Sequence, residues 1–157
     1  MTQAISKAQS TAVGTIISIG GVTGATGTET FTPVGSITNA KVSGLKIATT
    51  DVSTFLANVK RKLGTIVDYG TVTFTTLRVS NDAGQAAVIA AAATAQNYDF
   101  KIQLEPNSAA SQTTIGDLIT FSALVSEAGG FDLDLNKQPD YSFTLEIDGA
   151  WVVTEGS

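Results

Sequence analysis

The strongest constraint on the fold is a strict alternation of apolar and polar residues in three segments of the C-terminal half. The apolar positions are Tyr98, Phe100, Ile102 and Leu104; Ile119, Phe121, Ala123 and Val125; and Tyr141, Phe143, Leu145 and Ile147. Successive side chains of a β-strand point to opposite faces. A repeat of two therefore predicts three strands, each with one face on a core and the other in solvent.

Shorter motifs predict how these strands are connected. We expect a loop through Gly129-Gly130 between the second and third strands. Asp148-Gly149 predicts a type I′ hairpin, after which Ala150–Thr154 returns as a short final strand.

Two segments of the N-terminal half are also predicted to be strands. Ala12–Gly20 and Val34–Val42 are rich in β-branched residues, and the glycine- and threonine-rich segment Gly21–Thr30 between them predicts a flexible loop. We expect the two strands to form a long hairpin-like pair. Pro33 fits the start of the second strand, because proline cannot donate a ladder hydrogen bond.

The middle of the chain combines a basic cluster, a turn and a strand. Lys60-Arg61-Lys62 is the most basic cluster, and Asp68-Tyr69-Gly70 is a turn motif. Thr71–Val79 consists almost entirely of β-branched, aromatic and leucine residues, which predicts a strand.

The apolar residues of this central strand do not keep to one face. Val72 and Phe74 share one face, whereas Leu77 and Val79 fall on the other. A β-bulge near Thr75-Thr76 would restore a single apolar face. A strand covered on both sides also explains the pattern, and we favour it because a predicted helix follows at once.

That helix is predicted over Asp82–Gln96, since alanine is the best helix former. Asp82 and Gln85 have the spacing of a capping box. Asn97 is predicted to be the C-cap, because asparagine tolerates the left-handed conformation there.

Ser43–Leu63 is predicted to be a long protruding loop, and Met1–Thr11 an N-terminal arm. Long loops in compact domains are usually functional or disordered, and this one carries apolar residues, which indicates that it docks on something. The residues that we expect at a subunit or ring interface are Ile47, Asp51, Val52, Phe55, Leu56, Val59, Lys60, Arg61 and Lys62. With 157 residues the chain is predicted to be a single domain, 1–157. The predicted fold class is α+β, mainly β, with antiparallel sandwich or barrel-like sheets, one flanking α-helix and this loop.

Composition argues against most chemical functions. The chain has no histidine or cysteine, so the commonest general base, the commonest metal ligand and thiolate sites are all missing. A net charge of −5 disfavours tight binding of nucleic acid. Only 15% of residues are charged, against about 25% in typical domains, so either polar side chains or partners cover the surface. We predict no enzyme, no metal and no cofactor.

Four motifs have a functional interpretation that we reject for a structural one. Gly21–Gly27 lacks the Gly-Lys-Ser/Thr ending of a phosphate loop. Asp132–Asn136 begins like a calcium loop but has lysine where glycine is required. The carboxylate pairs Asp132/Asp134 and Glu146/Asp148 fit solvated strand faces better than a glycosidase site. Lys60-Arg61-Lys62 fits a solvated turn, or pairing with acids of a neighbour, better than a phosphate site.

Taken together, the segments resemble the major tail tube protein of long, non-contractile phage tails. That family often has a basic residue, an apolar–glycine–aspartate stretch and then Gly-x-Val-Thr entering a strand. Here the matching residues are Lys62-Leu63-Gly64, Asp68, Gly70, Val72 and Thr73. The order of elements is also similar: the helix that begins Asp82-Ala83-Gly84-Gln85, then Phe100-Lys101-Ile102 with Pro106, the strand Phe121–Val125 and the closing segment Tyr141–Gly149. The resemblance covers nearly the whole chain.

The resemblance implies a structural virion protein. It implies hexameric rings that stack into a hollow tube, a β-barrel continuous across subunits, and a channel through which DNA is ejected. The long loop and N-terminal segment would reach neighbouring subunits or rings. Implied partners are further copies of the chain and the tape measure, tail terminator and distal tail proteins, with transient passage of DNA and no membrane. The implied location is the virion tail, after assembly in the host cytoplasm.

A mildly acidic lining suits a DNA conduit, because a basic lining would hold phosphates by counterion release. Glu105, Glu146 and Asp148 are the predicted lumen-facing residues, and Asp68, Gly70 and Val72 the turn and strand anchor.

Two other functions remain open from the sequence. A tube of a contractile tail or secretion-type injection machine would have the same features, and a sheath partner would distinguish it. A β-sandwich binding module is the other alternative, but its aromatic residues would be expected on loops rather than at core-facing positions.

Overall fold

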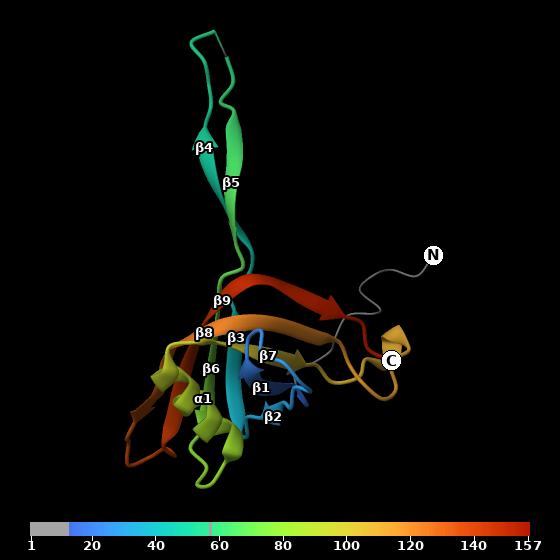
Figure 1. Ribbon diagram of the computed structural model, residues 1–157, viewed down its shortest axis with the longest axis vertical. Helices are drawn as coiled ribbons and strands as arrows, with labels where there is room; N and C mark the ends of the chain where they lie inside the picture. The colour runs from blue at the N-terminus through green and yellow to red at the C-terminus, as the bar shows by residue number, and fades with distance from the viewer. Residues whose placement is uncertain (1–12, 57) are drawn as a thin grey trace.

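The structure is a computed structural model that describes residues 13–56 and 58–157. These residues form a seven-stranded antiparallel sheet, one α-helix and a two-stranded arm that projects from the body (Figure 1). The elements are β1 (Ile16–Val22), β2 (Thr32–Pro33), β3 (Ile37–Val42), β4 (Lys46–Asp51), β5 (Lys62–Asp68), β6 (Thr71–Leu77), α1 (Ala83–Thr94), β7 (Asn97–Gln103), the short 3-10 helix η2 (Ser108–Ala110), β8 (Leu118–Asp132) and β9 (Asp140–Thr154). The fold is therefore α+β and mainly β, as predicted.

The large sheet bends back on itself because its two edges are joined by a short link. Its strand order is β2-β1-β7-β8-β9-β6-β3, so the edge strands β2 and β3 are consecutive in the chain, and only residues 34–36 separate them. In this link the Val34 N–H donates to the Ile17 carbonyl at 2.8 Å, and the Leu77 N–H donates to the Ser36 carbonyl at 2.9 Å. The link thus holds β1 and β6, from the two ends of the sheet, close to each other.

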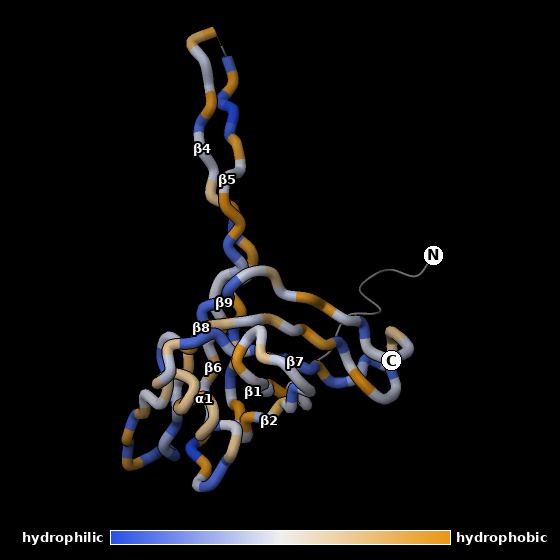
Figure 2. The backbone as a smooth tube through the Cα atoms, in the orientation of Figure 1, coloured by the Kyte–Doolittle hydropathy of each residue, from blue (hydrophilic) through white to orange (hydrophobic). Residues whose placement is uncertain are grey.

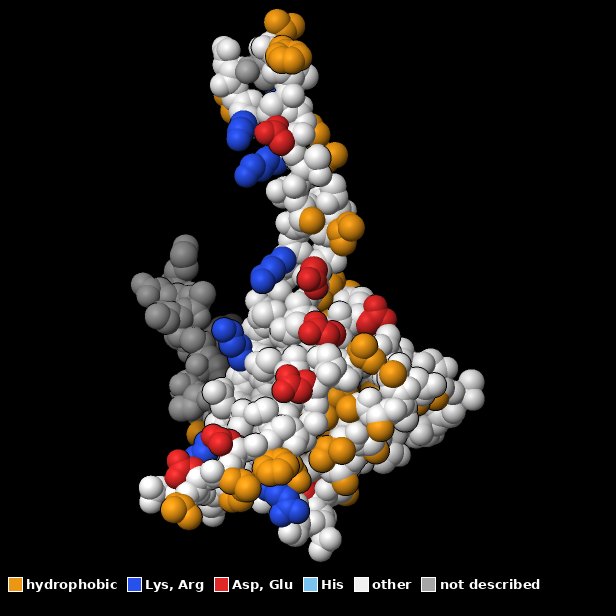
Figure 3. Space-filling view, turned by 90° about the vertical axis from the view of Figure 1, so that its left-hand side faces the viewer, with side chains coloured by type: hydrophobic (Ala, Val, Ile, Leu, Met, Phe, Trp, Pro, Cys, Tyr) orange, Lys and Arg blue, Asp and Glu red, His pale blue; other side chains and the backbone are white. Residues whose placement is uncertain are grey.

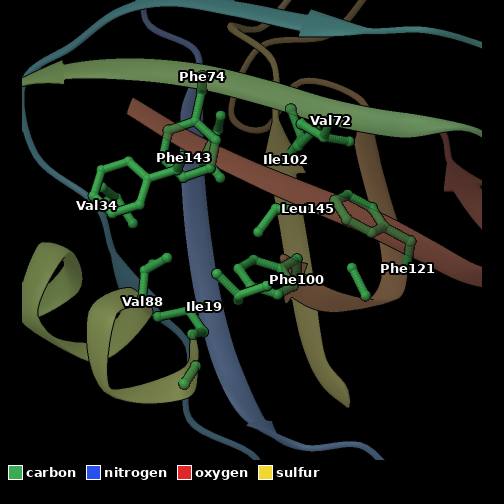
Figure 4. Close-up of a cluster of buried hydrophobic side chains, with 14 residues drawn as sticks. Ile19, Val34, Val72, Phe74, Val88, Phe100, Ile102, Phe121, Phe143 and Leu145 are labelled. Carbon is green, nitrogen blue, oxygen red and sulfur yellow. The ribbon is translucent and has the colours of Figure 1, made fainter. Parts of the chain in front are cut away.

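The inner face of the bent sheet forms the hydrophobic core (Figure 4). Phe74 stacks on Phe143 with ring centroids 4.9 Å apart, and Phe100 stacks on Phe121 at 5.8 Å. Every apolar residue of the three alternating segments is buried or half-buried, so the predicted period of two is confirmed. Burial of these side chains is the main favourable term in folding.

Helix α1 covers one end of the core and packs on β8, β2 and β1. The Asp82 side chain caps it by accepting from the Gln85 N–H at 2.9 Å. Gly84 allows its close approach, because a Cβ there would overlap the carbonyl of Pro33. Its observed C-cap is Ala95, in the left-handed conformation, and not Asn97, which instead starts β7.

The side chain of Gln85 has a different role from the one that the capping box predicts. It is buried and does not reach back to the Asp82 N–H. Its oxygen accepts from the Val79 N–H at 3.2 Å, and its nitrogen donates to the carbonyls of Gly35 and Leu77 at 3.1 and 2.8 Å. This one amide therefore joins the helix to the link between the sheet edges and to the end of β6.

The predicted N-terminal hairpin is wrong. Ser36 has a positive φ of 58°, so residues 34–36 of the predicted strand Val34–Val42 form a link, and only β3 (Ile37–Val42) is a strand; β2 (Thr32–Pro33) lies before it. β1 pairs with β2 over two residues only, whereas β3 pairs with β6. The apolar pattern predicted the strands but not their partners.

The predicted connections of the C-terminal strands are also wrong. Asp148-Gly149 is not a hairpin, because β9 runs through it without ending. Gly149 has a φ of 82°, and the register with β8 shifts there, which is typical of a bulge. Gly129-Gly130 likewise lies within β8, at another register shift, and the chain turns between Asp132 and Asp140.

The apolar residues of the central strand were predicted to reflect either a β-bulge or coverage of both faces, and neither explanation is correct for the subunit. β6 pairs with β9 in unbroken register from Thr71 to Leu77, so it has no bulge at Thr75-Thr76. Its second face is not covered by the helix, which packs elsewhere, and Thr73 on that face is exposed.

We predict that Gln85→Leu lowers the free energy of unfolding by about 3 kcal/mol, because Val79, Gly35 and Leu77 lose a hydrogen-bonding partner in a buried position. Chemical denaturation followed by circular dichroism measures this. Gln96→Leu, at an exposed position just after the helix, is the control and should change stability by less than about 0.5 kcal/mol. Equal stabilities for the two variants would contradict the role of Gln85.

Candidate assembly surfaces

The arm is a β-hairpin that stands away from the body (Figure 1). β4 and β5 pair antiparallel from Lys46 opposite Asp68 to Asp51 opposite Lys62, and every residue of both strands is exposed. The predicted loop Ser43–Leu63 is therefore partly regular, and its second strand extends to Asp68. The sequence did not reveal this, because neither strand has the alternation that a core imposes.

The arm carries an apolar surface without any core of its own (Figure 2). All nine residues predicted for the interface lie on it and are exposed. The prediction missed four further exposed apolar residues of the arm: Leu45, Leu63, Ile66 and Val67. The adjacent pair Ile66-Val67 could have indicated them, because neighbouring residues of a strand point to opposite faces and one of the two must therefore face outwards. A two-stranded hairpin is marginally stable in water, and exposed apolar surface of this kind is typical of an interaction site.

Basic residues concentrate at the outer half of the arm, just below its apolar tip (Figure 3). They are Lys60, Arg61 and Lys62, which follow the tip residues Phe55 and Leu56. Asp51 lies opposite Lys62 in the hairpin. Its carboxylate accepts hydrogen bonds from Ser53, and these lower the pKa of Asp51.

The base of the arm is a tight, hydrogen-bonded joint. The Asp68 carboxylate accepts from the Gly70 N–H at 2.8 Å, and the Ser43 hydroxyl accepts from the Thr71 N–H at 2.8 Å. Gly70 is buried with a φ of 87°, and Val72, two residues on, is in the core. The predicted anchor residues Asp68, Gly70 and Val72 therefore lie together where the arm joins the body.

The outer side of the sheet presents a polar surface, which we call the threonine face. Its side chains alternate with the core residues of β3, β6 and β9 and are Asn39, Lys41, Thr71, Thr73, Thr75, Ser142, Thr144, Glu146 and Asp148. It has two carboxylates and one ammonium group. The threonines at alternate positions 71, 73 and 75 are visible in the sequence but were not recognised as a surface.

The three predicted lumen residues do not lie together. Glu146 and Asp148 share the threonine face, and Asp148 accepts a hydrogen bond of 2.6 Å from the Asn97 amide. Glu105 follows the far end of β7, where it contacts Gly14 closely enough to limit substitution there. It is eight residues along the chain from Asn97, which is roughly 26 Å in an extended strand.

Strand β3 is an open edge of the sheet, because within the described part of the chain it pairs only with β6. Alternate residues of this six-residue strand direct their backbone N–H and C=O groups away from β6, to the open side. Open edges invite pairing with another chain.

Two further kinds of feature, metal sites and membrane-spanning helices, were searched for among the described residues. Among residues 13–56 and 58–157, no group of three or more acidic residues is placed to hold a metal ion. The same residues contain no helix with the length and apolarity needed to cross a membrane.

Comparison with known proteins identifies the fold. No protein-family model and no curated protein matches the sequence. A chain from the tail of an empty gene transfer agent particle, determined with C6 symmetry, superposes with a TM-score of 0.64 at 11% identity, covering 98% of this chain and 99% of that one. A chain of the SPP1 tail tube gives 0.62 at 14% identity, with 91% and 77% covered.

A chain from the sheath–tube complex of PVC, an extracellular contractile injection system in its extended state, gives 0.63 at 15% identity and covers 99% of both chains. The chain therefore has the fold found in tail and tube assemblies, and the predicted resemblance is confirmed at the level of fold.

We predict that Gly70→Ala destabilises the protein by about 2 kcal/mol more than Gly24→Ala, because overpacking typically costs 1–3 kcal/mol. Both glycines have a φ above 80°, so both variants incur the same backbone penalty. A Cβ at Gly70 would overlap the Ser43 hydroxyl and the Gly44 carbonyl, whereas a Cβ at Gly24 meets nothing within 4 Å. Thermal unfolding measures the difference, and equal losses would exclude steric constraint at the base of the arm.

Proposed function

We propose that this chain is the structural subunit of a hollow tail tube, made of stacked hexameric rings through which DNA is ejected. The observation that carries the proposal is the β4–β5 arm, whose apolar side chains have no partner in the subunit, on a fold found in tail and tube assemblies. Phe55 and Leu56 at its tip are almost fully exposed. A free monomer would rarely keep such an arm in water.

Ring closure uses the open edge of β3. Backbone pairing of β3 with a strand of the next subunit removes an edge that otherwise promotes aggregation. The C6 symmetry of the gene transfer agent tail is the precedent for six subunits. Repeated six times, this pairing joins the sheets into one barrel around a channel.

The threonine face lines that channel. It contains β3 and β6, so it continues across the open edge into the neighbouring subunit. Hydroxyl groups hydrate easily and carry no charge, and Glu146 and Asp148 repel phosphates. DNA can therefore slide without being held by counterion release. Glu105 is distant from this face, and we propose it only for the rim.

The proposed role is non-catalytic and needs no cofactor. The tube subunit would work in the virion tail after assembly in the host cytoplasm. Its partners would be other copies of itself, a terminator and a distal tail protein at the ends, and a tape measure protein inside. In this chain the single domain spans residues 1–157, and its N-terminal arm, 1–11, lies outside the described residues.

A second candidate is the inner tube of a contractile injection machine. The PVC chain matches this protein as well as the SPP1 chain does, and over a larger share of its own length. The fold suits both tubes. Co-purification of a sheath protein with the tube would favour the contractile machine.

We expect the purified protein, concentrated and left to stand, to form rings or hollow tubes in negative-stain electron micrographs. Averaged end views should show six subunits. Where nucleation is slow, the distal tail complex of the same particle should start growth. A uniform monomer that persists with this complex would overturn the proposal and favour the binding-module alternative.

Cysteine labelling tests which face lines the channel, since the chain contains no cysteine of its own. Thr73→Cys lies on the threonine face, and the control Ala93→Cys lies on the exposed side of α1. Both should react with a polymer-linked maleimide in the free subunit. In long tubes, Thr73→Cys should react with this bulky reagent at least about tenfold more slowly than in the free subunit, whereas the rate for Ala93→Cys should not change. A small maleimide should still label Thr73→Cys in the tubes. Equal rates with the bulky reagent would contradict the assignment.

A further inference from the structure

The most exposed apolar side chains of the protein lie at two separate ends. Phe55, Leu56 and Leu135 are the large apolar residues with more than nine-tenths of their surface exposed among the residues that the structure describes. Phe55 and Leu56 form the tip of the arm. Leu135 lies in the connection between β8 and β9, at the end of the body away from the arm (Figures 1 and 2).

The second end, residues 131–140, is as apolar as the tip of the arm, and we call it the acidic turn. Phe131 and Leu133 are also exposed there, at 62% and 71%. They alternate with Asp132 and Asp134, so the turn combines an apolar and an acidic surface.

The two ends carry opposite charges. The outer half of the arm has Lys60, Arg61 and Lys62 against Asp51, which gives three positive charges minus one, or +2, and Lys46 and Asp68 at its base cancel each other. The acidic turn has Asp132, Asp134 and Asp140 against Lys137, which gives one positive charge minus three, or −2.

Lys137 is already engaged within the turn. Its ammonium group lies 3.4 Å from the Asp132 carboxylate and 3.5 Å from that of Asp140, and these acids raise the pKa of Lys137. Asp132 remains largely exposed, with 76% of its side chain accessible. The carboxylates of the turn can therefore receive a basic partner from another chain.

Resting on the proposed function, we propose that the arm tip of one copy docks on the acidic turn of a second copy in the adjacent ring. Phe55 and Leu56 pack against Leu133 and Leu135, and the basic cluster lies against the aspartates. The contact joins two different surfaces, so each docked copy still offers one free end. Such a head-to-tail contact repeats without limit, as the stacking of rings requires.

Other exposed surfaces fit the arm less well. The threonine face has opposite charge in Glu146 and Asp148 but no exposed apolar group. Val152 on β9 is exposed and lines a pocket with Glu29 and Asp99, but the phenylalanines of that pocket are buried or half-buried. Among the surfaces of the described residues outside the arm, the acidic turn combines several large exposed apolar side chains with a net negative charge.

Charge reversal tests the docking. K60E/R61E changes the arm from +2 to −2, and D132K/D134K changes the turn from −2 to +2. Each double variant sets like charges against each other, and we expect the fraction that sediments as tubes at low salt to fall about tenfold or more. The fourfold variant sets opposite charges together again and should restore sedimentation. High salt should reduce all of these differences, because screening is strong beyond about 10 Å at 0.1 M.

The controls separate docking from folding. Thermal unfolding of K60E/R61E should match the wild-type protein, since both residues are on the surface. D132K/D134K loses the Lys137–Asp132 ion pair and the hydrogen bond from the Asn136 N–H, so a small loss of stability is expected, and its sedimentation is measured well below its own unfolding temperature. The control A93E, on the exposed side of α1, should leave the sedimenting fraction within about twofold of the wild-type value. Wild-type sedimentation by both double variants, or no recovery in the fourfold variant, would overturn the docking.

Cross-linking separates this proposal from the proposed function. L56C and L135C subunits, mixed and treated with a short bis-maleimide, should give covalent dimers, whereas L56C mixed with V153C, which is also exposed but lies on β9 outside the acidic turn, should not. Tubes without the L56C–L135C product would overturn the docking and leave the tube function standing. This product without rings or tubes would support the docking and overturn the tube function.

Discussion

The structure depends on the short link that joins the two edges of its large sheet. Residues 34–36 connect β2 to β3, and their backbone groups bond to β1 on one side and to β6 on the other. Because these strands belong to opposite ends of the sheet, the sheet can only bend back on itself. The two phenylalanine pairs, each formed by opposed residues of neighbouring strands, then belong to one core, and the buried Gln85 amide holds α1 against the same link.

Closure of the sheet at this link leaves other surfaces exposed. The polar side chains that alternate with core residues on β3, β6 and β9 form the threonine face. The edge of β3 stays open, and β4 and β5 leave the body through the hydrogen-bonded joint at Gly70. The arm lies outside the core, and in the proposed tube its apolar residues contact other chains. Stability and the proposed assembly would then use separate parts of the chain.

The sequence predicted which loop residues are exposed, but not the shape of the segment that carries them. The nine residues expected on the loop are exposed on the arm, because apolar residues in a long segment without core periodicity have few other uses. The hairpin form of the arm was missed, since its strands lack alternation. The acidic turn was interpreted only as a polar loop, although Phe131, Leu133 and Leu135 alternate with aspartates there. The role that we propose for this turn depends on its position at the end of the body away from the arm, which the sequence does not give.

The sequence by itself determined which residues enter the core, since a repeat of two leaves a strand only one apolar face to bury. It also determined that Asp82 caps the start of α1, and it excluded catalysis and metal binding by histidine or cysteine side chains. Only the tertiary structure decided which strands pair, and it made Asp148-Gly149 a bulge instead of a hairpin. The reason is that pairing depends on hydrogen bonds between distant backbone groups, which are the same for every residue type, whereas burial depends on the side chain itself.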